Sequence, residues 1–272
     1  MSHWSLYVNR SSQVLRDNLA KILLMQGADA PSRAPRSLFT FNTPQDISQF
    51  ATGSDSDIGG LSTVNFDFIE DETVNGPIGR VNRPTPPSSK NGAQPPVGTA
   101  RFWGTMSLRI PSTPAANKPR ITRSGYAGFR NKARPSLFGN ITEDLSSHDY
   151  LALRLRPSGN PITRTSYFVN IQTEDGIGME VWQHRLMFKN QDVPEEELLR
   201  VKDGGWEELY IPFNNFVLTH AGEISLQSKP TIRREKVKSI GISILGGNSG
   251  VEGRYELGID EIRAVNDEDV RR

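Results

Sequence analysis

Apolar and polar residues alternate along most of this 272-residue chain, and a period of two predicts short β-strands. In the stretch 150–156, which reads YLALRLR, leucines occupy every second position and alternate with alanine and arginines. Such a strand presents one face to a core and the other largely to water. Further strands are expected at Leu38–Phe41, Ser62–Phe68, Ala100–Leu108, Tyr126–Arg130, Thr165–Gln172, Glu207–Ile211, Ser239–Leu245 and Arg254–Ile262.

Helical patterns are few in the body of the chain. A turn near Asp46–Phe50 and a short piece at Pro194–Val201 have helical character, and neither is long enough to connect parallel strands. The pattern therefore predicts an all-β fold, an antiparallel sandwich, rather than a fold with a parallel sheet. We expect seven side chains to be buried between its sheets: Leu151, Leu153, Leu155, Ile242, Ile244, Leu257 and Ile259.

A short amphipathic helix is predicted ahead of the first strand, with Ser11 or Ser12 as its N-cap. Its apolar residues recur at helical spacing, at Leu15, Leu19, Ile22 and Leu23. The segment is basic, since Asp17 is its one acidic residue. A basic amphipathic helix is typical of a mitochondrial targeting segment. The same stripe also suits a helix packed against its own domain, and the pattern alone favours that second interpretation.

Composition divides the chain into three parts. Residues 1–36 form the helix and a linker, residues 37–266 form the sandwich domain, and residues 267–272 form a charged tail. Within the domain, the segment 70–99 contains VNRPTPPSSKNGAQPPVG. Such a segment is too rich in proline, glycine and serine to form a packed core, so we predict a mobile surface insertion there.

Charge and cysteine content narrow the classes of function. The chain has 32 basic and 31 acidic residues, and a net charge of +1 gives no long-range attraction for nucleic acid or anionic lipid. Local basic patches remain compatible with that balance. The absence of cysteine excludes disulfides, thiolate metal sites and a cysteine nucleophile. No apolar run approaches the roughly 20 residues of a transmembrane helix, so no transmembrane segment is predicted.

The stretch GSDSDIGGLS at 53–62 suggests a calcium loop or a phosphate loop, but its spacing fits neither. A calcium loop that starts at Asp55 requires an oxygen ligand at Gly59 and a glutamate at its twelfth position, where Phe66 stands. A phosphate loop requires Gly-Lys-Ser or Gly-Lys-Thr and a following helix. We therefore predict a turn, in which the aspartates accept backbone amides and the glycines adopt positive φ. A calcium site that uses other loops as well remains open.

Patterns of catalytic residues are weak. The four histidines are scattered, and no Gly-x-Ser-x-Gly motif surrounds a serine. A hydrolase on a sandwich would require two convergent carboxylates, for which Asp175, Glu180 and Glu207 are candidates. We predict that the protein is not an enzyme, and we assign no catalytic, cofactor-binding or metal-binding residue.

Aromatic residues leave a second class of function open. Trp103, Trp182, Trp206 and Tyr126 would serve a carbohydrate-binding module if they formed an exposed stacking platform. Aromatic residues on strands are more often part of the core.

An ordered set of short motifs resembles a known family. The motifs are DSDIGGLS, RFWGTMSL, GYAGFRNK, YLALRLR, SYFVNIQT, GWEELYIPFNNF, VKSIGISI and GRYELGIDEI, which start at Asp55, Arg101, Gly125, Tyr150, Ser166, Gly205, Val237 and Gly253. Their order and spacing are similar to those of the complex I intermediate-associated protein family, from about Leu38 to Val265.

The resemblance implies a galactose-binding-like jelly-roll sandwich without catalysis. It implies an assembly factor for mitochondrial NADH:ubiquinone oxidoreductase, which binds intermediates of complex I and other assembly factors, and it implies no cofactor. The expected location is the matrix side of the mitochondrion, with the inner membrane reached through the client. The alternative is a carbohydrate-binding module of the same fold.

Two segments are candidates for the client surface, because each sets cations beside apolar residues. The first is the basic run 118–123, with Arg120 and Arg123, and the second is the segment 182–190, with Trp182 and Arg185. Arginine and aromatic residues dominate well-packed interfaces, although both segments also suit solvated surface.

Overall fold

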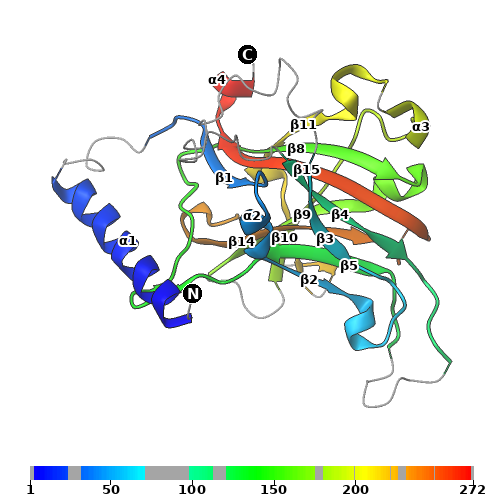
Figure 1. Cartoon of the computed structure of the whole chain (residues 1–272), viewed down its shortest axis with the longest axis horizontal. Coiled ribbons are helices and arrows are strands. Elements are labelled where there is room, and N and C mark those ends of the chain that lie inside the picture. The colour runs from blue at the N-terminus through cyan, green and yellow to red at the C-terminus, as the bar shows by residue number, and fades with distance from the viewer. Residues whose placement is uncertain are drawn as a thin grey trace.

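The computed structural model describes residues 3–23, 32–70, 98–112, 121–174, 180–198, 200–220, 222–225, 231–247 and 249–270. Two antiparallel sheets lie face to face and enclose one core (Figure 1). The chain passes repeatedly from one sheet to the other, as in a jelly roll, and the expected all-β sandwich is confirmed. The described helices are α1 (His3–Leu23), α2 (Pro44–Ser48), α3 (Glu195–Leu198) and α4 (Asp267–Val270).

The first sheet has six strands, and its long strand β15 lies at the centre. The order is β11 (Glu207–Pro212), β8 (Tyr150–Gly159), β15 (Gly253–Val265), β4 (Gly98–Met106) and β3 (Asn65–Glu70). Strand β1 (Arg36–Thr40) pairs with the second half of β15, beyond the part that pairs with β4.

The second sheet has seven strands. The order is β13 (Glu223–Ile224), β12 (Val217–His220), β10 (Glu180–Arg185), β9 (Tyr167–Thr173), β14 (Val237–Leu245), β5 (Tyr126–Asn131) and β2 (Phe50–Ser54). A small separate hairpin consists of β6 (Pro135–Ser136) and β7 (Gly139–Asn140). Neighbours in the seven-stranded sheet are often distant in sequence, so side chains of remote segments lie side by side on it.

The core contains the side chains that the alternation predicts. All seven expected residues of β8, β14 and β15 are at most 1% exposed, which confirms the prediction. Phenylalanine rings complete the core, and Phe66 stacks on Phe129 with 4.3 Å between the ring centroids. Burial of these apolar side chains is the main force that holds the two sheets together.

The alternation of apolar and polar residues did not predict several of the strands. Strands β2, β10 and β12 were not expected, because each has only four to six residues and no clean alternation of apolar and polar positions. The predicted insertion also cannot be compared, since residues 71–97 lie outside the described part of the chain. Its last two positions, Gly98 and Thr99, belong to β4.

The stretch 53–62 is a turn, as expected. It contains a 3₁₀ helix η1 (Asp55–Ile58), and Gly59 follows with φ of 109°. The buried Asp55 carboxylate accepts hydrogen bonds from the backbone amides of Ser62 (2.8 Å) and Gly125 (2.5 Å). Gly60 has a different role, because a Cβ there would lie 2.4 Å from the Asp55 carboxylate. The turn therefore joins the end of β2 to the start of β5.

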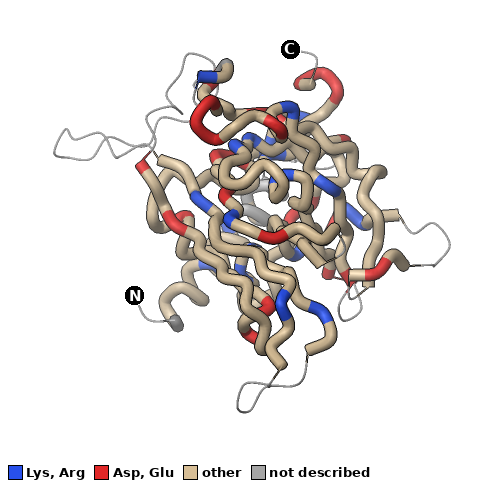
Figure 2. Tube along the Cα trace, turned by 90° about the vertical axis from the view of Figure 1, so that its right-hand side faces the viewer, with Lys and Arg blue, Asp and Glu red and all other residues tan. Residues whose placement is uncertain are grey.

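Charged residues are interspersed over the surface, as Figure 2 shows for one side of the molecule. Several form ion pairs, such as Arg263 of β15 with Glu208 of β11 at 3.0 Å, across the intervening β8, and Arg254 with Glu256 at 2.9 Å within β15. This arrangement fits a chain whose positive and negative charges nearly cancel.

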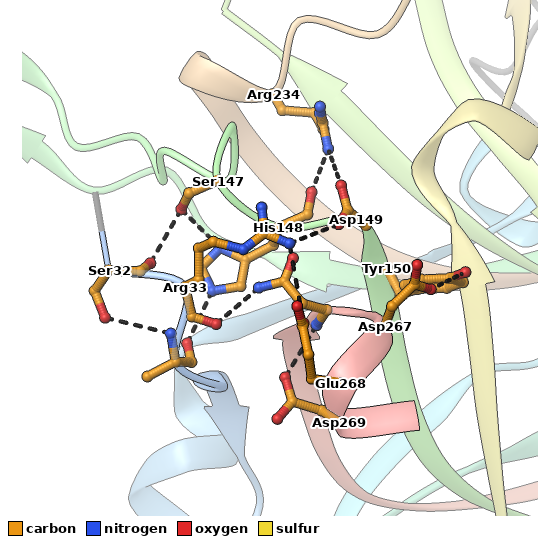
Figure 3. Close-up of polar contacts among 12 residues, drawn as sticks. Ser32, Arg33, Ser147, His148, Asp149, Tyr150, Arg234, Asp267, Glu268 and Asp269 are labelled. Carbon is orange, nitrogen blue, oxygen red and sulfur yellow. Dashed lines mark hydrogen bonds and ion pairs between the residues drawn. The ribbon is translucent and has the colours of Figure 1, made fainter. Parts of the chain in front are cut away.

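The linker before β1 is fastened to the sandwich by polar contacts (Figure 3). Arg33 pairs with Asp149 at 3.1 Å, and its carbonyl accepts the side-chain amide of Asn266 at 2.7 Å. The buried His148 donates from Nε2 to the carbonyl of Ala34 at 3.0 Å. These bonds hold residues 32–34 against the loop before β8 and the end of β15.

Helix α1 lies at one side of the sandwich, beside the β6–β7 hairpin (Figure 1). The prediction that its apolar stripe packs against its own domain is wrong for Leu15 and Leu19, which are 50% and 48% exposed. The side chains of Ile22 and Leu23 lie outside the described ones. The helix contacts the domain instead through Ser11, a neighbour of the stripe.

Candidate functional site

A groove of about 970 Å³ crosses the outer face of the seven-stranded sheet. Strands alternate their side chains between the two faces, so each inward residue has outward neighbours. In β9, Val169 and Ile171 are buried in the core, whereas Asn170 and Gln172 line the groove. In β10, Trp182 faces the core and Gln183 lines the groove. The floor is therefore built from the polar half of each strand.

A chain of side-chain hydrogen bonds runs across four of these strands. The hydroxyl of Thr219 in β12 donates a hydrogen bond to Oε1 of Gln183 at 3.1 Å. Nε2 of Gln183 in β10 donates to Oδ1 of Asn170 at 2.8 Å, and Nδ2 of Asn170 in β9 donates to Ser243 of β14 at 2.8 Å. Linked amides of this kind hold one another in fixed orientations and present a preformed polar surface.

A second group of bonds continues the polar floor. The hydroxyl of Ser239 and a guanidinium N–H of Arg130 both donate to Oε1 of Gln172, at 2.9 and 3.3 Å. Amides and hydroxyls provide both donors and acceptors, so this floor suits a neutral polar ligand such as a peptide or a polyol.

Glycines of three neighbouring strands line the groove, and one of them, Gly53, has open space above it. Gly53 of β2 lies opposite Gly128 of β5, and Gly241 of β14 follows on the next strand. A Cβ at Gly53 would meet only Oδ2 of Asp57, at 3.5 Å, so the space above this position is empty. Glycine inside a strand often marks the close approach of a ligand or another backbone.

Apolar and basic side chains form the rim. Ile110 and Tyr126 are 45% and 44% exposed. The phenol group of Tyr126 lies in the groove, and its partial burial raises the pKa of Tyr126. Arg130 opposes that shift and Asp57 adds to it. Arg123 also lines the rim and pairs with Glu223 at 2.8 Å. Among the described residues that line the groove, two are arginines and none is a carboxylate, histidine or cysteine. The lining therefore provides hydrogen bonds, apolar contact and positive charge rather than an acid–base pair.

The four candidate residues for a client surface have different outcomes. Arg120 lies outside the described residues, and Arg123 lies on the groove rim. Arg185 is exposed at the end of β10, where its Nε donates to the carbonyl of Thr165 at 2.6 Å. Trp182 is not at the surface, as its segment suggested, because it points from β10 into the core and is only 7% exposed.

The groove floor was missed by sequence reasoning. Asn170 and Gln172 lay in a predicted strand without an assigned role, and Gln183 lay in the candidate client segment 182–190, where only Trp182 and Arg185 were singled out. The signal that was available is the kind of polar residue: these positions carry uncharged amides, where an ordinary solvated face more often carries Lys or Glu. Which amides meet one another depends on strand pairing, as in Asn170 with Ser243, 73 residues apart.

The sequence also left open a sugar-stacking platform, a pair of catalytic carboxylates and a calcium site, and the described residues do not assemble any of the three. Trp182 is in the core and Trp206 is buried on the six-stranded sheet, so neither joins Tyr126 in a sugar-stacking platform. Asp175 lies outside the described residues. Glu207 is buried and accepts the backbone amides of Lys189 and Asn190. Within the described residues there is no cluster of three or more metal-ligating side chains, and no helix long and apolar enough to cross a membrane.

Known proteins resemble this chain in sequence over nearly its full length. The family described as Complex I intermediate-associated protein 30 (CIA30) matches residues 39–259, most of the sandwich. A Neurospora crassa protein named "Complex I intermediate-associated protein 30, mitochondrial" is 33% identical over 273 residues. The match covers 98% of this chain and 85% of that protein, so it includes most of α1 as well.

Solved structures resemble the chain in fold. A family 11 carbohydrate-binding module from Clostridium thermocellum, in complex with a mixed-linked tetrasaccharide, has 14% identity and a TM-score of 0.49, and the match covers 87% of this chain and 98% of the module. An exo-β-agarase has 11% identity and a TM-score of 0.43, over 85% of this chain and 25% of the agarase. At such identities the likeness concerns the fold and carries nothing about a ligand.

Proposed function

The chain belongs to the complex I intermediate-associated protein 30 family, and from this premise we propose that it is a non-catalytic assembly factor. It binds an intermediate of mitochondrial respiratory complex I and promotes the assembly of that complex. The observation that carries the proposal is the match of 33% identity over 98% of the chain. A match of that extent includes the linker and helix as well as the sandwich.

We place the client surface in the groove of the seven-stranded sheet and along its rim. The groove is large enough for a chain segment, its floor is preordered, and its lining carries positive charge without a carboxylate. These features favour a neutral or acidic segment of the client. Arg123 on the rim and Arg185 at the end of β10 are candidate contacts. With a net charge of +1, the protein recognises its client by such local features rather than by long-range attraction.

The proposed location is the matrix side of the mitochondrion, in contact with the inner membrane through the client. The support is the mitochondrial name of the relative and the basic amphipathic helix at the N-terminus.

The decisive experiment compares mitochondria with and without this protein on native gels. We expect the tagged protein to migrate with a subassembly of complex I, and its deletion to cause loss of mature complex I with accumulation of partial complexes. Complementation with the full chain should restore the mature complex. Normal levels of complex I in the deletion strain, at normal levels of the other respiratory complexes, would refute the proposal.

A further inference from the structure

Exposed large apolar side chains concentrate at one place on this molecule. Seven of the fifteen in the described residues belong to α1 or to the tip of the β6–β7 hairpin, although these segments are a small part of the chain. They are Trp4, Leu6, Val8, Leu15, Leu19, Leu137 and Phe138. A soluble surface rarely keeps so many together unless something covers them.

Four of these residues form one stripe along the helix. Trp4, Val8, Leu15 and Leu19 are spaced by four, seven and four residues, which brings them to the same side of an α-helix. Their exposed fractions are 71%, 39%, 50% and 48%. Leu6 lies nine residues before Leu15, about half a turn away, and therefore on the opposite side. The stripe is about 25 Å long at 1.5 Å per residue.

The hairpin contacts the helix at Ser11, on the same side as this stripe, and leaves the four side chains of the stripe exposed. Ser11, which is 4% exposed, accepts the backbone amide of Leu137 at 3.0 Å and donates to the carbonyl of Tyr7 at 2.8 Å. The hairpin tip, Leu137 and Phe138, is 63% and 64% exposed beside the middle of the helix. Figure 1 shows α1 beside the sandwich, not between its layers.

The helix is also net basic, in an otherwise balanced chain. It carries Arg10, Arg16 and Lys21 against Asp17, a local charge of +2, and no acidic residue in its first turn. Arg16, which follows Leu15, lies beside the stripe, whereas Arg10 lies on the other side of the helix, near Leu6. An apolar stripe that ends in a tryptophan, on a helix whose other positions carry arginines, matches the interface between lipid headgroups and acyl chains. Within the described residues α1 packs mainly on the hairpin, and the side chains of the stripe are exposed rather than enclosed in a groove that could hold a helix of another protein.

We propose that α1 and the β6–β7 hairpin tip form a lipid-binding surface that holds the protein on an anionic bilayer. The stripe of Trp4, Val8, Leu15 and Leu19 enters the boundary between headgroups and acyl chains, together with Leu137 and Phe138. Arg16, beside the stripe, pairs with the lipid phosphates. Contact with the membrane is then direct, in addition to any contact through a client.

The test uses the purified full chain and vesicles without any component of complex I, so its outcome is independent of the proposed function. We expect the protein to sediment with vesicles of equal parts phosphatidylcholine and phosphatidylglycerol, and much less with phosphatidylcholine alone. Binding to the anionic vesicles should weaken as salt is added, because salt screens the attraction of the basic residues. A blue shift of tryptophan fluorescence that is lost in Trp4→Gln would report insertion of the stripe.

Matched variants distinguish insertion of the stripe from nonspecific binding to the vesicles. The double variant Leu15→Gln/Leu19→Gln should bind anionic vesicles about tenfold more weakly or worse, because two apolar side chains no longer enter the bilayer. Leu6→Gln makes the same chemical change on the opposite side of the same helix and should leave binding within about twofold. Circular dichroism and thermal melting of each variant confirm that the helix and the sandwich remain folded.

Three results would overturn the proposal. One is equal binding to neutral and anionic vesicles, or none to either. Another is an equal loss for Leu6→Gln and for the Leu15→Gln/Leu19→Gln variant. The third is a mature protein, isolated from mitochondria, whose N-terminus begins after Leu23.

Discussion

The outer faces of the two sheets are built from the same alternation but are covered differently. On the six-stranded sheet, Trp206 is 5% exposed and lies over Gly258, and the guanidinium of Arg156 sits 5.0 Å from the centre of its ring. Ion pairs such as Arg263 with Glu208 cover the neighbouring strands. On the seven-stranded sheet, amides and hydroxyls line an open groove above glycines.

This difference separates a face that contributes stability from a face that is available for binding. Trp206 closes the space above one glycine, Gly258, whereas the space above Gly53 stays open. Glycine in a strand weakens it, so an unfilled position of that kind has a cost in stability that a binding role would explain. We expect substitutions on the two faces to differ accordingly.

The largest effect on stability is expected for Trp206→Ala. Removal of a buried tryptophan side chain should lower the free energy of unfolding by about 3–5 kcal/mol. Asn170→Ala in the groove should cost only about 1 kcal/mol, because water can replace its hydrogen bonds. Urea denaturation measures both values. If Asn170→Ala destabilises the protein as much as Trp206→Ala, the groove is a structural element and the comparison fails.

The next prediction concerns the groove face, where a substitution should impair function while the free energy of unfolding stays nearly constant. Gly53→Leu places a side chain in the groove; its Cβ would meet only Oδ2 of Asp57, at 3.5 Å, and Gly53 does not have positive φ. We expect the free energy of unfolding to change by less than about 1 kcal/mol, while native gels show stalled subassemblies of complex I.

The matched control is Thr105→Leu, an exposed position on the outer face of the six-stranded sheet. It adds the same side chain away from the groove and should leave assembly unchanged. Full assembly in a folded Gly53→Leu variant would move the client surface elsewhere.

The smallest effect concerns pH and Tyr210 on the six-stranded sheet. Burial, and then the hydrogen bond to Glu208, raise the pKa of Tyr210 from 10.0 to about 12. The unfolded chain therefore loses this proton at a lower pH than the folded chain. Tyr210 contributes stability that is complete below pH 10 and is lost as the pH rises towards about 12.

The measurement is urea denaturation of the wild type and Tyr210→Phe at several pH values across this range. The variant should lose less stability between pH 10 and 12, because phenylalanine has no proton to release. Parallel pH profiles for the two proteins would show that Tyr210 is solvated like a free tyrosine.

Much of the fold was predictable because strand alternation is a local property. Leucines at every second position of β8 point to one side whatever the strand pairs with, so their burial follows once any sandwich forms. The turn at 53–62 was predictable for a similar reason, since its donors, acceptors and glycines lie close together in sequence. The family followed from the ordered motifs, which the match over residues 39–259 confirms.

The placement of individual tryptophans was not predictable in the same way. Trp206 shares one sequence motif with Ile211, Phe213 and Phe216. Those three are in the core, but Trp206 covers the outer face of the sheet. Its direction depends on Gly258, 52 residues further along the chain, which leaves room for the ring.

The groove was decided by the tertiary structure alone. Alternation specifies that Gln183, Asn170 and Ser243 face away from the core, but not that they meet one another. They meet because β10, β9 and β14 are neighbours in the sheet, and that order is set by long-range pairing and packing across the whole core. The exposed stripe of α1 shows the same division. The sequence determines the helical spacing of its apolar residues, whereas the contact between Ser11 and the hairpin decides which of them stay exposed. Within a strand or a helix the face on which a residue lies is a local property, whereas the residues that it meets are set by the tertiary structure.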